Sequence, residues 1–299
     1  MHPLAEIRSL IARHTRPGEV YSPFDGIRLI AQTAPTVPTS SMQRAAFALV
    51  AQGVKRTVLG DNVYEYRAGD FIVVPLDVPV VGQVVKASPK QPYLAFVWDL
   101  QPALITSLML EGGIDTRVAG RATSVAVSRA PDALLDPIAR LLRLLDQPQD
   151  IAILRPMLER EIAWRILTGE QGRTLTAIGL ADSQLSRINR ALLQIRACYA
   201  DTLRIEDLAA TAAMSVATFH RHFRAITALS PLQFQKQVRL HEARARLMAG
   251  TRDIASVGFE VGYQSPSQFS REYARFFGVR PLEDLKQSRS GIAFNSVLI

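Results

Sequence analysis

The sequence predicts an α+β protein in which a β-rich N-terminal domain precedes an all-α C-terminal domain. Short β-branched runs separated by turn residues fill residues 24–101, and helical periodicity begins after Pro102. A length of 299 residues also suits two domains better than one. We expect the following division: a first domain at 1–170, a linker at 171–184, a second domain at 185–288 and a tail at 289–299.

The N-terminal domain is expected to be a sandwich or a barrel of short strands. Stretches rich in β-branched and aromatic residues occur at 44–52, 55–60, 62–75, 78–88 and 93–100. Gly60-Asp61-Asn62 predicts a hairpin turn, and prolines mark several strand ends. Strands at a spacing of roughly ten residues, with no helices between them, are typical of a sandwich or a barrel.

Helices are expected to flank these strands. Residues 1–20 read as a polar helix, and broad apolar stripes run along 132–145 and 151–162. The Gly- and Thr-rich stretch that follows predicts the linker. The helices at 132–168 carry more apolar surface than a small barrel must cover, so they are candidates for a homodimer contact. Packing on the barrel is the alternative.

Positive charge is concentrated in the C-terminal domain. The chain has a formal net charge of +8, and residues 185–299 hold 16 Lys and Arg against 9 Asp and Glu. A basic domain joined to a nearly neutral one indicates a polyanionic partner for the basic part. Charge alone leaves DNA, RNA and an anionic membrane open.

Several classes of protein are disfavoured by composition. No run approaches 18 apolar residues, and the charged N-terminus lacks the apolar core of a signal peptide, so no membrane partner is expected. The single cysteine, Cys198, excludes an intramolecular disulfide and fits a reducing compartment. We therefore expect a cytoplasmic protein.

A two-helix unit occurs at residues 205–227. Ile205, Leu208 and Ala212 give a short helix one apolar face, and Ala213-Met214 form a break. Ser215 is a favourable N-cap for a second helix. Two short helices joined by a tight turn form the helix-turn-helix pattern, whose second helix can enter a DNA major groove.

The unit is repeated at about residues 252–277. Gly262 supplies the turn, Ser265 the N-cap and Pro266 the first helical position, and Gln268 is expected to complete a capping box. One long helix, Pro231 to Met248, is predicted between the two units.

These segments resemble a known family. AAMSVATFHRHFRAITALSPLQFQKQVRLHEARARLM and VGFEVGYQSPSQFSREYARFFGVRP are similar to the two signature segments of the DNA-binding domain of AraC/XylS transcriptional regulators. The resemblance runs over roughly 185–288, and the N-terminal 170 residues resemble the cupin-like sensor domain of one AraC subgroup. It implies a cupin-like β-barrel with flanking helices, followed by an all-α domain with two helix-turn-helix motifs.

The resemblance also implies a function. We expect a sequence-specific, effector-responsive transcriptional regulator whose two recognition helices read adjacent major-groove segments. An activator is one expected role, and repression stays open. Expected partners are double-stranded promoter DNA, a small-molecule effector, a second copy of the chain and RNA polymerase. No cofactor and no enzymatic activity are expected.

Helical geometry and the resemblance together select DNA-contacting residues. With Phe219 directed inward, Arg221 falls on the outer face of its helix. Carried over by position, the family's base-contacting sites fall on Ala217, His220, Arg221, Pro266, Ser267, Gln268 and Arg271. Arginine suits bidentate pairing with guanine, and Gln268 suits adenine. Phosphate contacts are expected from Thr218, Arg224, Arg239 and Ser265.

For the N-terminal domain, a cavity for an effector and a dimerisation platform compete. Aromatic side chains predicted to point inward could line a cavity: Phe47, Tyr64, Tyr66, Phe71, Phe96 and Trp98. Small barrels also fill their interiors with such residues, so the pattern alone does not separate the two hypotheses.

The main rival function is a cupin-like metalloenzyme, or a ligand-binding module with an accessory DNA-binding domain. The histidines are His2, His14, His220, His222 and His241. None of them lies within 24–127, where the strands are expected, so no metal site is predicted. GxSxG, P-loop and GxGxxG motifs are absent. Short capped helices also disfavour RNA and membrane binding, which need exposed aromatics or one long amphipathic helix.

Overall fold

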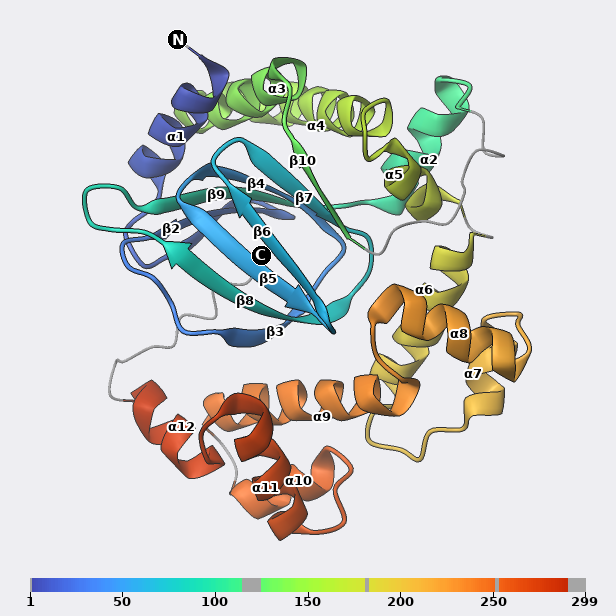
Figure 1. Ribbon diagram of the computed structural model, residues 1–299. Helices are drawn as coiled ribbons and strands as arrows, with labels where there is room; N and C mark the ends of the chain where they lie inside the picture. Colours follow the sequence, from blue (N-terminus) through green and yellow to red (C-terminus); the bar gives the residue numbers. More distant parts are fainter. Residues whose placement is uncertain (1, 115–124, 181–182, 251–252, 290–299) are drawn as a thin grey trace.

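The computed structural model describes residues 2–114, 125–180, 183–250 and 253–289. A β-sandwich with helices over one face forms the N-terminal part, and helices alone form the C-terminal part (Figure 1). The predicted α+β class is therefore confirmed.

Two antiparallel sheets make up the sandwich. Their strand orders are β1-β2-β9-β4-β7-β10 and β3-β8-β5-β6. The strands are β1 (Val20–Phe24), β2 (Ile27–Gln32), β3 (Thr39–Gln43), β4 (Ala46–Gln52), β5 (Val54–Leu59), β6 (Asn62–Arg67), β7 (Asp70–Val74), β8 (Val78–Lys86), β9 (Tyr93–Asp99) and β10 (Ala126–Arg129). Within the described residues no ladder joins the two sheets, so the expected barrel is an open, cupin-like sandwich.

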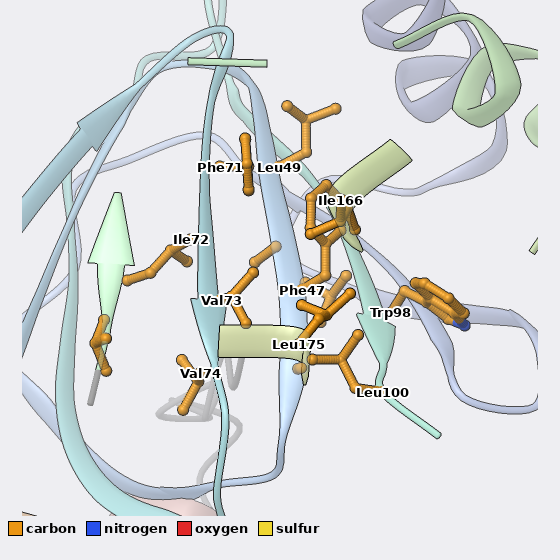
Figure 2. Packing of buried hydrophobic residues seen from close by; sticks show 14 of the residues in the cluster. Phe47, Leu49, Phe71, Ile72, Val73, Val74, Trp98, Leu100, Ile166 and Leu175 are labelled. Carbon is orange, nitrogen blue, oxygen red and sulfur yellow. The ribbon is translucent and has the colours of Figure 1, made fainter. Parts of the chain in front are cut away.

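Helices cover the outer face of the six-stranded sheet. They are α1 (Pro3–His14), α2 (Pro102–Glu111), α3 (Asp132–Arg143), α4 (Ile151–Leu167) and α5 (Gly172–Gly179), with the 3-10 turns η2 (Leu144–Asp146) and η3 (Pro148–Asp150). Figure 2 shows Phe47 and Trp98 on the side of the sheet that faces Ile166 of α4 and Leu175 of α5. Since alternate residues of a strand point to opposite faces, the residues that alternate with Phe47 on β4 and with Trp98 on β9 point between the two sheets.

This arrangement corrects part of the effector prediction. Phe47 lies opposite Trp98 in the ladder β4–β9, and Phe71 and Phe96 each lie opposite Leu49, two residues further along β4, so all four share the helix-covered face. Each is at most 3% exposed. They pack under the helices, away from the interior between the sheets. Tyr66 points into that interior.

The predicted linker is also wrong over part of its length. Residues 172–179 form α5, which packs against α2 and α4. Leu175 is fully buried, and Thr106 of α2 donates a hydrogen bond to the carbonyl of Gly179 at 2.7 Å. The Gly and Thr residues that suggested a loop instead allow close approach, because a Cβ at Gly179 would lie 2.7 Å from the sulfur of Met109.

The C-terminal domain contains the duplicated unit. Its helices are α6 (Gln184–Ala197), α7 (Ile205–Thr211), α8 (Val216–Thr227), α9 (Pro231–Met248), α10 (Ile254–Glu260), α11 (Pro266–Phe277) and α12 (Pro281–Arg289). The pairs α7–α8 and α10–α11 fall on the two predicted units, and α9 is the predicted long helix. The expected tail lies outside the described residues from position 290 onward.

The sandwich rests on the helical domain through its four-stranded sheet, and α9 runs beneath this sheet between the two units (Figure 1). Oγ of Ser40 on β3 lies 3.3 Å from Nε2 of His241 on α9. The β5–β6 turn packs on the end of α8 so closely that a Cβ at Gly60 would lie 2.2 Å from Cβ of Ala228. Thus one sheet is both a wall of the sandwich and the support of the helical domain.

Candidate nucleic-acid interface

The first unit is held by an aromatic core. Phe219 and Phe223 of α8 are fully buried, with ring centroids 5.4 Å apart, and Phe223 meets Phe234 of α9 edge to face at 5.9 Å. Leu208 of α7 closes the same core at 1% exposure. Because the inner face of α8 is fixed in this way, its outer face is presented rigidly to solvent.

The second unit uses the same design. Phe269 and Tyr273 of α11 are fully buried, with ring centroids 5.6 Å apart. The hydroxyl of Tyr273 donates to Asp284 of α12 at 2.6 Å, and Arg244 of α9 pairs with the same carboxylate at 2.9 Å. The matched aromatic spacing in α8 and α11 therefore gives two equivalent outward faces.

Serine caps the N-termini of both recognition helices. Oγ of Ser215 accepts the N–H of Thr218 at 3.3 Å, and Oγ of Ser265 accepts the N–H of Gln268 at 3.5 Å. The predicted capping box at Gln268 is wrong, because its amide donates to Glu272 one turn further along. A complete capping box occurs instead at the start of α9.

Left-handed residues close both turns. Gly262 follows α10 with φ 94°, and a Cβ there would lie 2.3 Å from the carbonyl oxygen of Ala200. In the first unit Ala213 takes the corresponding place with φ 51°. An L-residue in this conformation is strained by roughly 1–2 kcal/mol, so the backbone of the turn is more strained in the first unit than in the second.

The outer face of α8 carries most of the contacts predicted for the first unit. Four side chains are exposed: Ala217, His220, Arg221 and Arg224. Thr218 is half-buried, and its hydroxyl accepts a hydrogen bond from Ser215 at 3.0 Å. The exposed set contains two guanidinium groups, that of Arg221 in the middle of the helix and that of Arg224 about one turn later.

The corresponding face of α11 is also open. Ser267, Gln268 and Arg271 are exposed, whereas Ser265 and Pro266 are half-buried where the helix begins. The two exposed arginines, Arg221 and Arg271, occupy the same place relative to the first buried phenylalanine of each helix. This correspondence is what a duplicated reading surface requires.

Arg239 has a different position from the other predicted phosphate contacts. Its guanidinium donates to the backbone carbonyls of Tyr199 (2.6 Å), Gly262 (2.9 Å), Asp201 (2.9 Å) and Ala200 (3.2 Å). These carbonyls belong to the α6–α7 loop and to the turn of the second unit. Arg239 therefore joins α9 and the α6–α7 loop to the turn of the second unit, and we leave it out of the proposed DNA-contacting set.

Sequence reasoning missed Glu272, which lies beside the exposed face of α11 formed by Ser267, Gln268 and Arg271. Its carboxylate accepts hydrogen bonds from Lys236 at 2.7 Å, Tyr263 at 3.0 Å and Gln268 at 3.5 Å. Burial alone would raise the pKa of Glu272, but the bonds from Lys236 and Tyr263 lower it overall. The i, i+4 spacing from Gln268 was the available signal.

This network lines an open groove of ≈ 740 Å³ formed by the α6–α7 loop, α9 and the second unit. Lys236, Gln268 and Glu272 all line it. The long 3.5 Å contact to Glu272 holds the amide of Gln268 only weakly at the edge of this groove.

Comparison with protein families agrees with this geometry. Residues 23–174, just over half of the chain, match the model described as the AraC-type transcriptional regulator N-terminus, and residues 208–287 match a helix-turn-helix domain. The chain belongs to the AraC/XylS family of transcriptional regulators. For this AraC-type protein the second match begins within α7 and covers α8, α9, α10 and α11 completely.

Two relatives illustrate the sequence similarity. The HTH-type transcriptional regulator ArgR of Pseudomonas aeruginosa is 28% identical over 156 residues, which are 52% of this chain and 47% of ArgR. The HTH-type transcriptional activator RhaS of Escherichia coli is 24% identical over 163 residues, which are 54% of this chain and 58% of RhaS. The match thus spans about half the length of these relatives.

Solved structures of ToxT from Vibrio cholerae share the fold. ToxT bound to (E)-4-(8-methylnaphthalen-1-yl)but-3-enoic acid superposes with a TM-score of 0.59 at 11% identity, covering 87% of this chain and 97% of ToxT. Wild-type ToxT bound to an unsaturated fatty acid gives the same TM-score over 93% of its chain. The likeness extends over both domains of the AraC-type protein.

The described part of the chain was also searched for a metal site and for a membrane-spanning helix. No three His, Cys, Asp or Glu side chains lie together there as a metal site would need. No helix in those same segments has the length and apolar character needed to cross a membrane.

Proposed function

We propose that this regulator binds promoter DNA sequence-specifically through α8 and α11 and responds to a small effector held by its N-terminal sandwich. The observation that carries the proposal is the pair of equivalent outward arginines, Arg221 and Arg271, on two separately built helices. Both lie in the domain that holds nearly all the excess positive charge. Guanidinium groups at the same position of two helices favour two DNA-contacting helices over arginines that only face solvent.

The exposed side chains divide by chemistry into readers and positioning groups. Direct readout is assigned to Arg221, Arg271 and Gln268, because guanidinium pairs bidentately with guanine and a primary amide pairs with adenine. Ala217, His220, Pro266 and Ser267 flank these readers and complete the base-contacting set. Thr218, Arg224 and Ser265 are assigned to the phosphate backbone, where contacts fix register without specifying sequence.

The N-terminal domain supplies the effector response in this proposal. Its fold is that of ToxT, which has been solved with a fatty acid and with a synthetic carboxylic acid. An effector there alters how the four-stranded sheet supports α9 and α8, through the contacts at Ser40 and Gly60. The role is regulatory and not enzymatic, and its setting is the cytoplasm, where promoter DNA and RNA polymerase are its further partners.

A second copy of the chain is proposed to dock on α4. Ile153 and Met157 are 70% and 61% exposed, and Leu154 is 39% exposed. A groove of ≈ 330 Å³ beside them is lined by Leu154, Met157 and Leu158. Apolar side chains gathered on one helix face are typical of an interface, and two copies would engage adjacent half-sites.

The test is selection of bound sequences from random duplex DNA by the full chain. The expected result is an enriched site with two conserved elements about one helical turn, roughly 10 base pairs, apart. Binding to that site should weaken steeply with salt, because each neutralised phosphate releases counterions. Failure to enrich any sequence would contradict the proposal. Binding that does not change with salt concentration would contradict phosphate contacts by the basic C-terminal domain.

A further inference from the structure

The carboxylate of Glu272 lies at the edge of the recognition helix α11, next to the side chain of Gln268. With Phe269 directed inward, steps of roughly 100° per residue place Gln268 between Arg271 and Glu272 around the helix. Gln268 and Arg271 are exposed, whereas the side chain of Glu272 is 19% exposed and faces Lys236 of α9. The glutamate therefore lies between the exposed face of α11 and helix α9.

Two donors outside α11 hold this carboxylate. Nζ of Lys236 lies 2.7 Å from Oε1 of Glu272, and the hydroxyl of Tyr263, in the turn before α11, donates to Oε2 at 3.0 Å. Tyr263 is itself 5% exposed, and its ring packs on Phe269 with the centroids 5.3 Å apart. Because each oxygen has a partner on a different element, the carboxylate is held in one orientation.

Glu272 is held in its charged form. Although burial acts to raise the pKa of Glu272, the hydrogen bonds from Lys236 and Tyr263 lower it below its usual value. Burial raises the pKa of Tyr263, so its hydroxyl stays a neutral donor. An ionised carboxylate only accepts hydrogen bonds. Any atom of Gln268 that meets Glu272 must therefore be a donor.

The side-chain amide of Gln268 turns its nitrogen toward this carboxylate. Nε2 lies 3.5 Å from Oε1 of Glu272, and within the described residues the side chain makes no other hydrogen bond. A bond of this length contributes little energy, but the flipped amide would bring two acceptor oxygens to the same distance. Glu272 therefore selects one of the two amide orientations, and the oxygen of Gln268 points away from it.

The selected orientation matches adenine in the major groove. A primary amide has one oxygen and two N–H groups, and Glu272 engages one N–H of Gln268. The other N–H and the oxygen together match N7 and the N6 amino group of adenine. Guanine and thymine present the oxygens O6 and O4 instead of an amino group, so both oppose the oxygen of the amide.

We propose that Glu272 is a specificity-determining positioning residue, which orients the amide of Gln268 so that α11 prefers adenine to guanine or thymine at one base pair. This inference rests on the proposed DNA readout by α11. Glu272 acts through Gln268 and does not itself touch the base. Since Lys236 and Tyr263 hold the carboxylate, the base preference depends on the contact between α9 and α11 as well as on the exposed side chains.

The experiment compares four full-length proteins on one set of DNA duplexes: the wild type, Glu272→Gln, Gln268→Ala and the double variant. The duplexes are the selected site and all of its single-base variants, and fluorescence anisotropy gives a Kd for each. At the position where Gln268→Ala removes the preference, the wild type should favour adenine over guanine or thymine by about ten-fold. Glu272→Gln keeps the side-chain length but allows the amide to flip, so this ratio should fall to about two-fold.

The double-mutant cycle separates orientation of the amide from a structural role. Glu272→Gln should leave the base preference that depends on Arg271 unchanged, and in the Gln268→Ala background it should change no preference at all. Removal of a negative charge beside DNA should raise the affinity for every duplex by the same factor. Glu283→Gln, which neutralises an exposed carboxylate of α12, is the matched control and should leave every ratio between bases unchanged. Melting curves verify that each variant is folded.

The following results would overturn the inference: a wild-type adenine preference in Glu272→Gln, an equal loss of the preference that depends on Arg271, or a base other than adenine at the position that depends on Gln268. A Gln268→Ala variant that keeps every wild-type preference would overturn it as well. In each of these cases an enriched DNA site leaves the regulator assignment standing. If the wild type enriches no site, the proposed function itself fails.

Discussion

Ser40 of the sandwich and His241 of α9 meet across the domain boundary, with Oγ and Nε2 3.3 Å apart. The imidazole stands edge-on to Phe276 and Phe277, at 5.3 and 5.6 Å between ring centroids. Burial and the nearby charge of Arg244 lower the pKa of His241 to about 4. The domain contact is therefore built around a neutral histidine.

Acid should weaken this contact. The folded-state pKa of His241 lies below its unfolded value of 6.5, so the unfolded chain binds more protons between pH 6.5 and 4. The free energy of unfolding should fall as pH falls through this window, by at most about 1.4 kcal/mol per pH unit from this group. Thermal unfolding of the wild type and His241→Leu measures the difference in slope. Equal slopes of unfolding free energy against pH for the wild type and His241→Leu would contradict the assignment.

Lys55 of β5, which is 2% exposed, predicts a second pH dependence at higher pH. Burial, with added repulsion from Arg28, lowers its folded pKa to about 7, below the unfolded value of 10.5, so the unfolded chain binds the extra proton between these values. Stability should rise as pH increases from 7 toward 10. Lys55→Met should lack this rise and be more stable than the wild type at pH 6.5, because a methionine of similar length needs no partner. A destabilised Lys55→Met that keeps the wild-type slope would show that Lys55 is stabilised by contacts within the chain.

Arg271 and Arg275 of α11 form a matched pair for testing readout. Both are exposed, but only Arg271 lies on the face that corresponds to Arg221. Arg271→Ala should cost about 1–3 kcal/mol at one base position and relax specificity there. Arg275→Ala should leave the preference for each base unchanged. Affinities for all single-base variants of the selected site measure this, and an equal loss on every variant would make Arg271 a phosphate contact.

Arg239 is predicted to act on stability. Arg239→Met removes hydrogen bonds to four backbone carbonyls and should destabilise the helical domain by about 2–4 kcal/mol. Lys236→Met, on the same helix, removes one partly exposed ion pair and should change stability by less than about 1 kcal/mol. At a temperature where both variants are folded, Arg239→Met should keep the wild-type slope of the logarithm of the DNA-binding constant against the logarithm of salt concentration. A slope smaller by about 1 would indicate that Arg239 contacts a DNA phosphate.

The helical domain could be predicted closely because its signals are local. Residues at its own ends predict where α9 lies: Ser230-Pro231 mark its start, and Gly250 follows its end. The aromatic spacing predicts the inner faces of α8 and α11. The partner of Arg239 could not be found in this way. Its carbonyl acceptors lie about 23 to 40 residues away in sequence, and only the packed fold brings them together.

The sandwich shows where periodicity fails. Strands β4 and β9 are buried on both faces, so alternation separates Phe47 and Trp98 from their neighbours without saying which set faces the partner sheet. The buried position of Lys55 was missed because lysine is ordinarily a surface residue. A signal existed in the hairpin register, which pairs Lys55 with Tyr66 and places it on the same face as Thr57 and Leu59.

The exposed apolar face of α4 gives the last prediction. A glutamate in the centre of a dimer contact would be buried without a partner, so Met157→Glu should convert a dimer to a monomer. Light scattering coupled to size exclusion measures this. Leu193→Glu, at a residue of α6 that is 52% exposed, is the matched control and should keep the wild-type mass. Both positions are solvent-facing in the single chain, so neither variant should lower Tm appreciably through its own fold. If Met157→Glu keeps the mass of a dimeric wild type, the contact lies elsewhere, and α3 and α4 serve only to cover the sheet.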